Sequence, residues 1–144
     1  MDVLKVFSVD RWEDTPGLND ICSLDSKASF ALSRSFLESL SRHHHRIVTI
    51  ERDHCLLGFS LVLVYEQGDH LIRIVVDPAF QGQGIGGQLL DRTLKEGKQS
   101  VFLEVAMGNA AAIALYRRRG FEFAGEIRQF YSNGESAHRM VLTR

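Results

Sequence analysis

Apolar residues recur along the chain in two patterns, strict alternation and a wider spacing in which every third or fourth residue is apolar. The first pattern is typical of strands and the second of helices. Strands are predicted at 3–9, 46–52, 55–65, 72–76, 101–105, 121–131 and 137–143, and helices at 18–25, 30–42, 85–96 and 109–119. Turns at Asp53-His54 and Asn133-Gly134 are expected to close two hairpins. This order predicts an α/β fold in a single domain, with a mixed, mostly antiparallel sheet flanked by about four helices.

A glycine-rich segment directly follows the β-branched run at 72–76, which predicts a buried strand. Asp77-Pro78 ends that strand, because proline lacks the N–H that a ladder needs. A helix with an apolar stripe then begins at Ile85. Glycines let the backbone approach a ligand, and the first N–H groups of a helix carry a partial positive charge. The segment therefore predicts an anion site, most simply for a pyrophosphate.

Two well-known nucleotide-binding loops do not fit this segment. A Walker loop needs Gly-Lys-Ser/Thr, whereas Gly86-Gly87-Gln88 has neither a lysine nor a hydroxyl. A dinucleotide fingerprint has the spacing GxGxxG, whereas the spacing here is GxGxGG. The alternatives that remain are another kind of anion loop, or a turn that only joins strand to helix.

A second informative segment runs from 102 to 120 and joins a strand to a helix. Asn109 is placed to cap that helix, since its side chain can accept a first-turn N–H. Glu104 interrupts the apolar strand and shares a face with Phe102, so it needs a partner or a function if it is buried. Acyl transfer to an amine would use such a carboxylate as a base. It would also use an acid that protonates the leaving group, for which the phenol of Tyr116 is a candidate.

Both segments resemble motifs of one enzyme family. Gln81, Gly84 and Gly86 set the spacing Gln-x-x-Gly-x-Gly, which after Val-Asp-Pro resembles the acetyl-CoA loop of the GCN5-related N-acetyltransferases (GNAT). The sequence LEVAMGNAAAIALYRRRGF, followed by RQFY, resembles the ribosomal-protein-alanine (RimI) type of that family. The resemblance implies one acetyltransferase domain over 1–144. Its acceptor-side half would be 1–70, and its acetyl-CoA-binding and catalytic half 71–144.

The resemblance also implies a role for individual residues. Glu104 would be the proton acceptor and Tyr116 the proton donor. The pantetheine arm of acetyl-CoA would pair with the strand backbone of Ile74, Val75 and Val76. Its end would lie near Asn109, the cap of the following helix. The pyrophosphate would lie on Gln81, Gly82, Gln83, Gly84, Ile85, Gly86 and Gly87. One wall of the acceptor site is expected to include Arg128, Tyr131 and His138.

The acceptor amine is left open by the sequence. Ala106-Met107-Gly108 stands where the RimI type carries an arginine and a serine, and the first half lacks the Pro-Trp segment of that type. Candidates are a ribosomal protein N-terminus, another protein N-terminus, an amino acid, a polyamine and an aminoglycoside. Neither motif contains cysteine, so direct transfer is expected rather than an acyl-cysteine route. Two other classes stay open, a CoA-binding sensor without chemistry and an adaptor that uses the basic cluster Arg117, Arg118 and Arg119.

Composition bears on the partners and cellular location of the protein more than on its reaction. The chain has 144 residues and a net charge of −1, so nothing in its overall charge indicates a nucleic-acid or anionic-membrane partner. It has no signal peptide and no run of the ~20 apolar residues that span a bilayer, so a cytoplasmic location is expected. Cys22 and Cys55 lack CxxC spacing and are expected to be buried apolar residues. No metal is expected, because the adjacent His43, His44 and His45 point in different directions and indicate a solvated helix end. The oligomeric state stays open, with a homodimer as one candidate.

Overall fold

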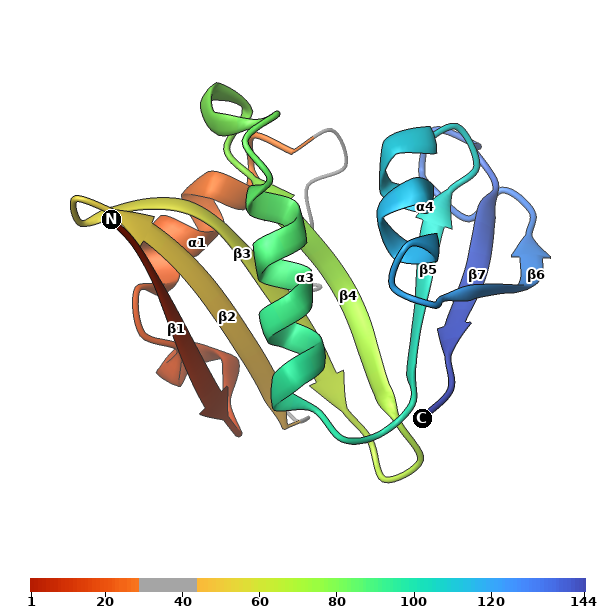
Figure 1. The fold of residues 1–144 in the computed structure, drawn as a ribbon, viewed down its shortest axis with the longest axis horizontal. Coiled ribbons are helices and arrows are strands. Elements are labelled where there is room, and N and C mark those ends of the chain that lie inside the picture. The colour runs from red at the N-terminus through yellow and green to blue at the C-terminus, as the bar shows by residue number, and fades with distance from the viewer. Residues whose placement is uncertain (29–43) are drawn as a thin grey trace.

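The strands form one mixed sheet (Figure 1). The computed structural model describes residues 1–28 and 44–144, in which seven strands run in the order β1-β2-β3-β4-β5-β7-β6. Neighbouring strands are antiparallel except β4 and β5, which are parallel. The strands are β1 (Asp2–Val9), β2 (His45–Arg52), β3 (Cys55–Val64), β4 (Asp69–Val76), β5 (Val101–Ala106), β6 (Glu122–Ile127) and β7 (Ala137–Leu142). The prediction of a mixed, mostly antiparallel sheet is confirmed.

Helices cover both faces of this sheet (Figure 1). α3 buries Ile85 and Leu89 against one face of β2 and β3, and α1 buries Ile21 and Leu24 against the other. The helices of the described residues are α1 (Leu18–Asp25), α3 (Ile85–Glu96) and α4 (Ala110–Arg117), with 3-10 turns η1 (Trp12–Asp14) and η3 (Pro78–Phe80). Three of the four predicted helices are thus confirmed, and the fourth, at 30–42, lies outside the described residues.

The parallel contact between β4 and β5 is short. Only Asp69 with Val101 and His70 with Phe102 are paired, and the two strands then diverge (Figure 1). β4 stays paired with β3 as far as Val76. Beyond His70, the other edge of β4 has no strand partner within the described part of the chain, so its backbone groups depend on side chains, water or a ligand.

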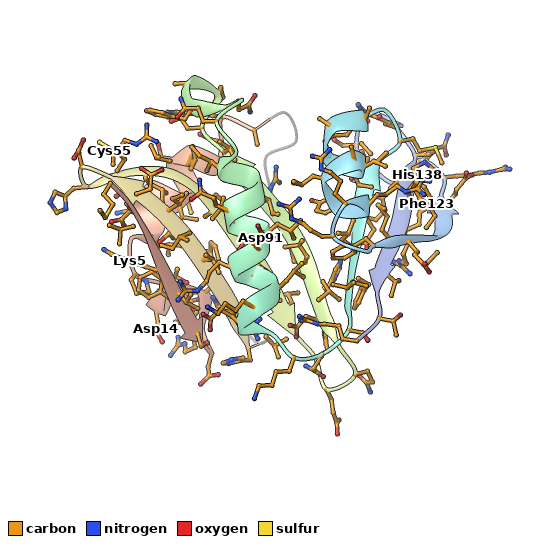
Figure 2. All side chains as sticks on the ribbon, in the orientation of Figure 1. Lys5, Asp14, Cys55, Asp91, Phe123 and His138 are labelled. Atoms are coloured by element: carbon orange, nitrogen blue, oxygen red, sulfur yellow. The ribbon has the colours of Figure 1, made fainter. Side chains whose placement is uncertain are left out.

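A shared apolar cluster holds the two diverging parts of the sheet together. Leu71 of β4 and Leu90 of α3 pack in it with Leu103 of β5 and Tyr116 of α4. An ion pair adds to this contact, because the Nε of Arg119, just after α4, lies 2.7 Å from the Oδ1 of Asp91. Asp91 lies on α3 (Figure 2). The separation of β4 from β5 is therefore fixed by packing on the α3 and α4 side of the sheet.

Both predicted hairpins form, but the first strand of the second one is shorter than predicted. Asp53 and His54 have φ angles of 51° and 64°, as in the type I′ turns that match strand twist, so the first hairpin is confirmed. The predicted strand at 121–131 is too long, because β6 ends at Ile127. Gln129 turns the backbone with a φ of 50°, and its N–H is accepted by the Oγ of Ser136 at 3.2 Å. The segment from 128 to 136 is therefore a loop between β6 and β7.

Gly58 allows β3 to pack closely against β4 and α3. A Cβ at this position would lie 2.7 Å from the carbonyl oxygen of Val75 and 3.0 Å from the Cδ1 of Leu89. We expect Gly58→Ala to lower the free energy of unfolding by about 1–3 kcal/mol, because backbone and helix must both move. Gly86→Ala is the matched control, since its Cβ would meet atoms no closer than 3.8 Å and alanine favours a helix. Equal urea midpoints for the two variants would contradict this packing.

Candidate active site

The glycine loop leads into α3 with open space beside it. Gly82 and Gly84 have φ angles of 82° and 79°, a conformation that favours glycine. Gly84 is the N-cap of α3 and supplies no side-chain cap, so the first N–H groups of the helix depend on other acceptors. A Cβ added at Gly82 or Gly84 would meet nothing within 4 Å. The predicted glycine-rich turn before a helix start with free N–H groups is present, and the structure adds that two of its glycines are left-handed.

A β-bulge changes the side-chain alternation of β4 where it leaves β5. The β3–β4 register shifts at this point and adds Ile72 as an extra residue. Ile72 and Arg73 consequently both face α1, where Ile72 packs in the core and the Nε of Arg73 lies 3.1 Å from the Oδ1 of Asp25. The next side chains pack into core clusters on alternating faces, at Ile74, Val75 and Val76. A ligand on this edge would therefore meet the backbone of 74–76.

Glu104 is a buried carboxylate with two partners from neighbouring strands. Its side chain is 9% exposed and lies on the face of Phe102, as predicted, because the alternate residues of β5 pack on the α4 side. Its Oε1 lies 2.8 Å from the Nε2 of His70 on β4. Its Oε2 lies 3.6 Å from the Nε of Arg139, its register partner on β7. These two groups compensate the charge, which a buried carboxylate requires.

Tyr131 interacts electrostatically with Glu104 and with a second tyrosine, Tyr116. Burial raises the pKa of Tyr116 to about 12, with a smaller contribution from Tyr131. Tyr116 therefore keeps its proton at neutral pH. Burial also raises the pKa of Tyr131, and the negative charges of Glu104 and Glu135 raise it further, while Arg73 lowers it. Of the predicted site residues, Tyr131 is thus within electrostatic reach of both Glu104 and Tyr116, whereas Tyr116 packs with Leu103 on the α4 side of β5, opposite Glu104.

The other predicted site residues outside the glycine loop are Asn109, Arg128 and His138. Asn109 caps α4 as predicted, because its Oδ1 accepts the N–H of Ala112 at 3.2 Å. Arg128 is exposed in the β6–β7 loop. His138 pairs with Val105 on the α4 side of the sheet, and its ring packs 4.8 Å from that of Phe123 (Figure 2). The structure therefore does not bring His138 to the face of Glu104.

Two side chains of the glycine loop are turned back toward the protein. The Nε2 of Gln81 donates to the carbonyl oxygen of Val76 at 3.4 Å. The Oε1 of Gln83 accepts from the guanidinium of Arg52 at 3.4 Å. Both glutamines therefore help to shape the loop, and a ligand would meet mainly its backbone.

The groups that face Glu104 were not predicted from the sequence. His70 and Arg139 are 34 and 35 positions away along the chain, and only the strand register makes them neighbours. The imidazole of His70 stacks on Phe102 with ring centroids 4.3 Å apart, and the guanidinium of Arg139 lies 5.9 Å from the same ring. No local motif indicates either contact.

Two expectations about histidine and cysteine need correction. His45 is not part of a solvated helix end, because it is the first residue of β2 and is fully buried against Trp12. His44 is exposed and pairs with Asp10, while His43 lies outside the described residues. Cys55 is not buried, because it follows the exposed turn between β2 and β3.

Neither a metal cluster nor a membrane helix is found in the ranges 1–28 and 44–144. Within them, no group of three or more His, Cys, Asp or Glu side chains could hold a metal ion. No helix there is both long and apolar enough to cross a bilayer.

The fold is α/β, and its two parallel strands part beside a helix start that has no side-chain cap, an arrangement that can accept an anion. The sequence profile of the Acetyltransferase (GNAT) family matches residues 8–121, which is most of the chain. The chain belongs to this family.

Relatives with assigned names lie within the same family. The ribosomal protein bS18-alanine N-acetyltransferase of Escherichia coli (strain K12) is 39% identical over 91 residues, 60% of this chain and 62% of that protein. The chain thus spans less than two thirds of that relative's length. N-alpha-acetyltransferase RimI of Mycobacterium tuberculosis is 35% identical over 114 residues, 74% of this chain and 71% of that protein. The crystal structure of the E. coli ribosomal-protein-S18-alanine N-acetyltransferase aligns with a TM-score of 0.83 at 29% identity, covering 98% of this chain and 94% of that one.

Proposed function

We propose that this protein is an acetyl-CoA-dependent N-acetyltransferase that moves an acetyl group directly to the α-amine of a protein N-terminus. The observation that carries the proposal is the pairing of β4 with β5 over two residues only, just before the glycine loop. An unpaired backbone edge that leads to an anion site suits a donor with amide groups at one end and a pyrophosphate at the other. The acceptor class is supported by the names of the two relatives, a protein-alanine and an N-alpha-acetyltransferase.

The open loop fits the donor. Acetyl-CoA supplies an acetyl group activated as a thioester. The backbone of Ile74, Val75 and Val76 would align the pantetheine arm, and the uncapped start of α3 would hold the pyrophosphate. The space beside Gly82 and Gly84, where a Cβ meets nothing within 4 Å, gives the phosphates access to those N–H groups.

Glu104 and Tyr116 would manage the protons of the reaction. The amine arrives protonated, and an α-amine, with a pKa of about 7.7–8.0, gives up its proton more readily than a lysine amine at ~10.4. Glu104 would accept that proton, the nitrogen would attack the thioester carbon, and the C–S bond would break. Tyr116 is protonated at neutral pH and would present its O–H to the departing thiolate. One proton per acetyl group is released to solvent overall.

Tyr131 fits the acceptor side best among the residues assigned to it from the sequence. Its phenol is close enough to Glu104 for that charge to raise its pKa, and it lies on the β6–β7 loop. An amine that reaches Glu104 would therefore pass this ring. Arg128, on the same loop, would contact more distant parts of the acceptor.

Gly84 offers a test of the anion site that separates charge from shape. Its φ of 79° is tolerated by asparagine and aspartate better than by other side chains. We expect Gly84→Asp to weaken acetyl-CoA binding by about tenfold or more, because its carboxylate repels the pyrophosphate at the helix start. Gly84→Asn is the matched control, with the same shape and no charge. Titration calorimetry that gave equal affinities for both variants would contradict a pyrophosphate site here.

Thiol release from acetyl-CoA tests the reaction and its acceptor together. The panel consists of N-terminal peptides, amino acids, polyamines and aminoglycosides. We expect turnover with N-terminal peptides, and a loss of about 10²–10⁴-fold in kcat for Glu104→Gln with acetyl-CoA affinity unchanged. Turnover with small amines alone would identify a small-molecule acetyltransferase. Tight acetyl-CoA binding without turnover on any acceptor would indicate a CoA-binding sensor, and either result would contradict the proposed acceptor.

A further inference from the structure

His70 makes the shortest contact with the proposed base. It is the last residue of β4 that pairs with β5, and its register partner is Phe102. Its Nε2 lies 2.8 Å from the Oε1 of Glu104, which is hydrogen-bond distance. His70 thus lies where the two strands part. Its register partner, Phe102, is two residues before Glu104 on β5.

The ring of His70 is held in a fixed plane. It stacks on Phe102 at an interplanar angle of 16°, and its side chain is only 19% exposed. A carboxylate can only accept hydrogen bonds, so a neutral imidazole in this contact must carry its proton on Nε2 and donate it. The stacking therefore holds the plane of the ring, and the contact of Nε2 with Oε1 sets the tautomer.

The two oxygens of Glu104 are held differently. Oε1 is engaged by His70, whereas Oε2 makes no hydrogen bond with any described residue. The nearest cation to Oε2 is the guanidinium of Arg139 at 3.6 Å, on a side chain that is 45% exposed and therefore screened by water. Oε2 is buried from solvent, but it has no hydrogen-bond partner among the described residues, so it is the oxygen left to accept a proton from an amine that enters beside Arg139.

We propose that His70 is a positioning residue for Glu104, donating Nε2–H to Oε1 so that Oε2 is presented to the acceptor amine. This inference rests on the proposed acetyltransferase function. The amine proton passes to Oε2, directly or through one water, while His70 keeps its own proton throughout. The charged and titratable groups around the carboxylate are then His70 from β4, Arg139 from β7 and Tyr131 from the β6–β7 loop.

Two substitutions of His70 distinguish a positioning role from a role as proton carrier and from no role in turnover. His70→Leu removes the donor and keeps an apolar side chain against Phe102. His70→Gln keeps an N–H donor near the position of Nε2 but cannot titrate. For wild type and both variants, kcat and KM for the acceptor would be measured from pH 6 to 9, together with acetyl-CoA affinity and melting temperature.

We expect His70→Leu to lower kcat by roughly 10- to 100-fold, the cost of a misplaced catalytic group, with acetyl-CoA affinity retained. The melting temperature should fall, because the buried Glu104 loses one of its two partners, and His70→Gln should restore it. His70→Gln should restore most of kcat and leave the shape of the pH profile unchanged. Equal losses in the two variants would overturn the inference, because they would mean that His70 itself carries the proton. Full activity of His70→Leu would also overturn it. Absence of wild-type turnover on every amine would instead refute the proposed function, and the inference with it.

Discussion

The short parallel pairing of β4 with β5 is the constraint on which the site depends. Two residue pairs join the strands, and the core cluster of Leu71, Leu90, Leu103 and Tyr116 then keeps them apart on the side of α3 and α4. The bulge at Ile72 turns the next side chains into the core on both faces. The edge of β4 can therefore offer only backbone groups, and these lead to the uncapped start of α3. The proposed donor site therefore depends on this strand divergence, which the packing of the core maintains.

The second constraint is electrostatic and concerns a carboxylate placed inside a sheet. Glu104 is tolerated because β4 and β7 each bring a donor to its face, His70 on one side and Arg139 on the other. The two partners differ in exposure, so the carboxylate is held firmly at one oxygen and loosely at the other. Such an asymmetry suits a group that must stay ionised and also accept a proton. Tyr116, whose pKa is raised by burial, is suited to the opposite task of keeping a proton until the thiolate leaves.

Local chemistry in the sequence was enough to predict most elements and part of the site. The turn at Asp53-His54, the glycine loop, the cap at Asn109 and the face of Glu104 depend on residues close together along the chain. The contacts of His70 and Arg139 with Glu104 depend on the register between strands more than 30 residues apart, which no local pattern encodes. The predicted strand ran past the true end of β6, because the left-handed residue that follows it, Gln129, is neither glycine nor asparagine and so gives no turn signal in the sequence. His138 was assigned to the acceptor side without knowing its register partner, Val105, which places it across the sheet.

Hydrogen–deuterium exchange with and without acetyl-CoA tests most directly whether the parted edge of β4 binds the donor. The prediction is that amides of 73–76 and 82–88 gain protection on binding, because the pantetheine arm and pyrophosphate take their N–H groups. Amides of 6–9 on the edge strand β1, which β2 and β3 separate from β4, should exchange at the same rate in both states. Saturating acetyl-CoA that raised the melting temperature yet left exchange at 73–76 unchanged would contradict the central claim.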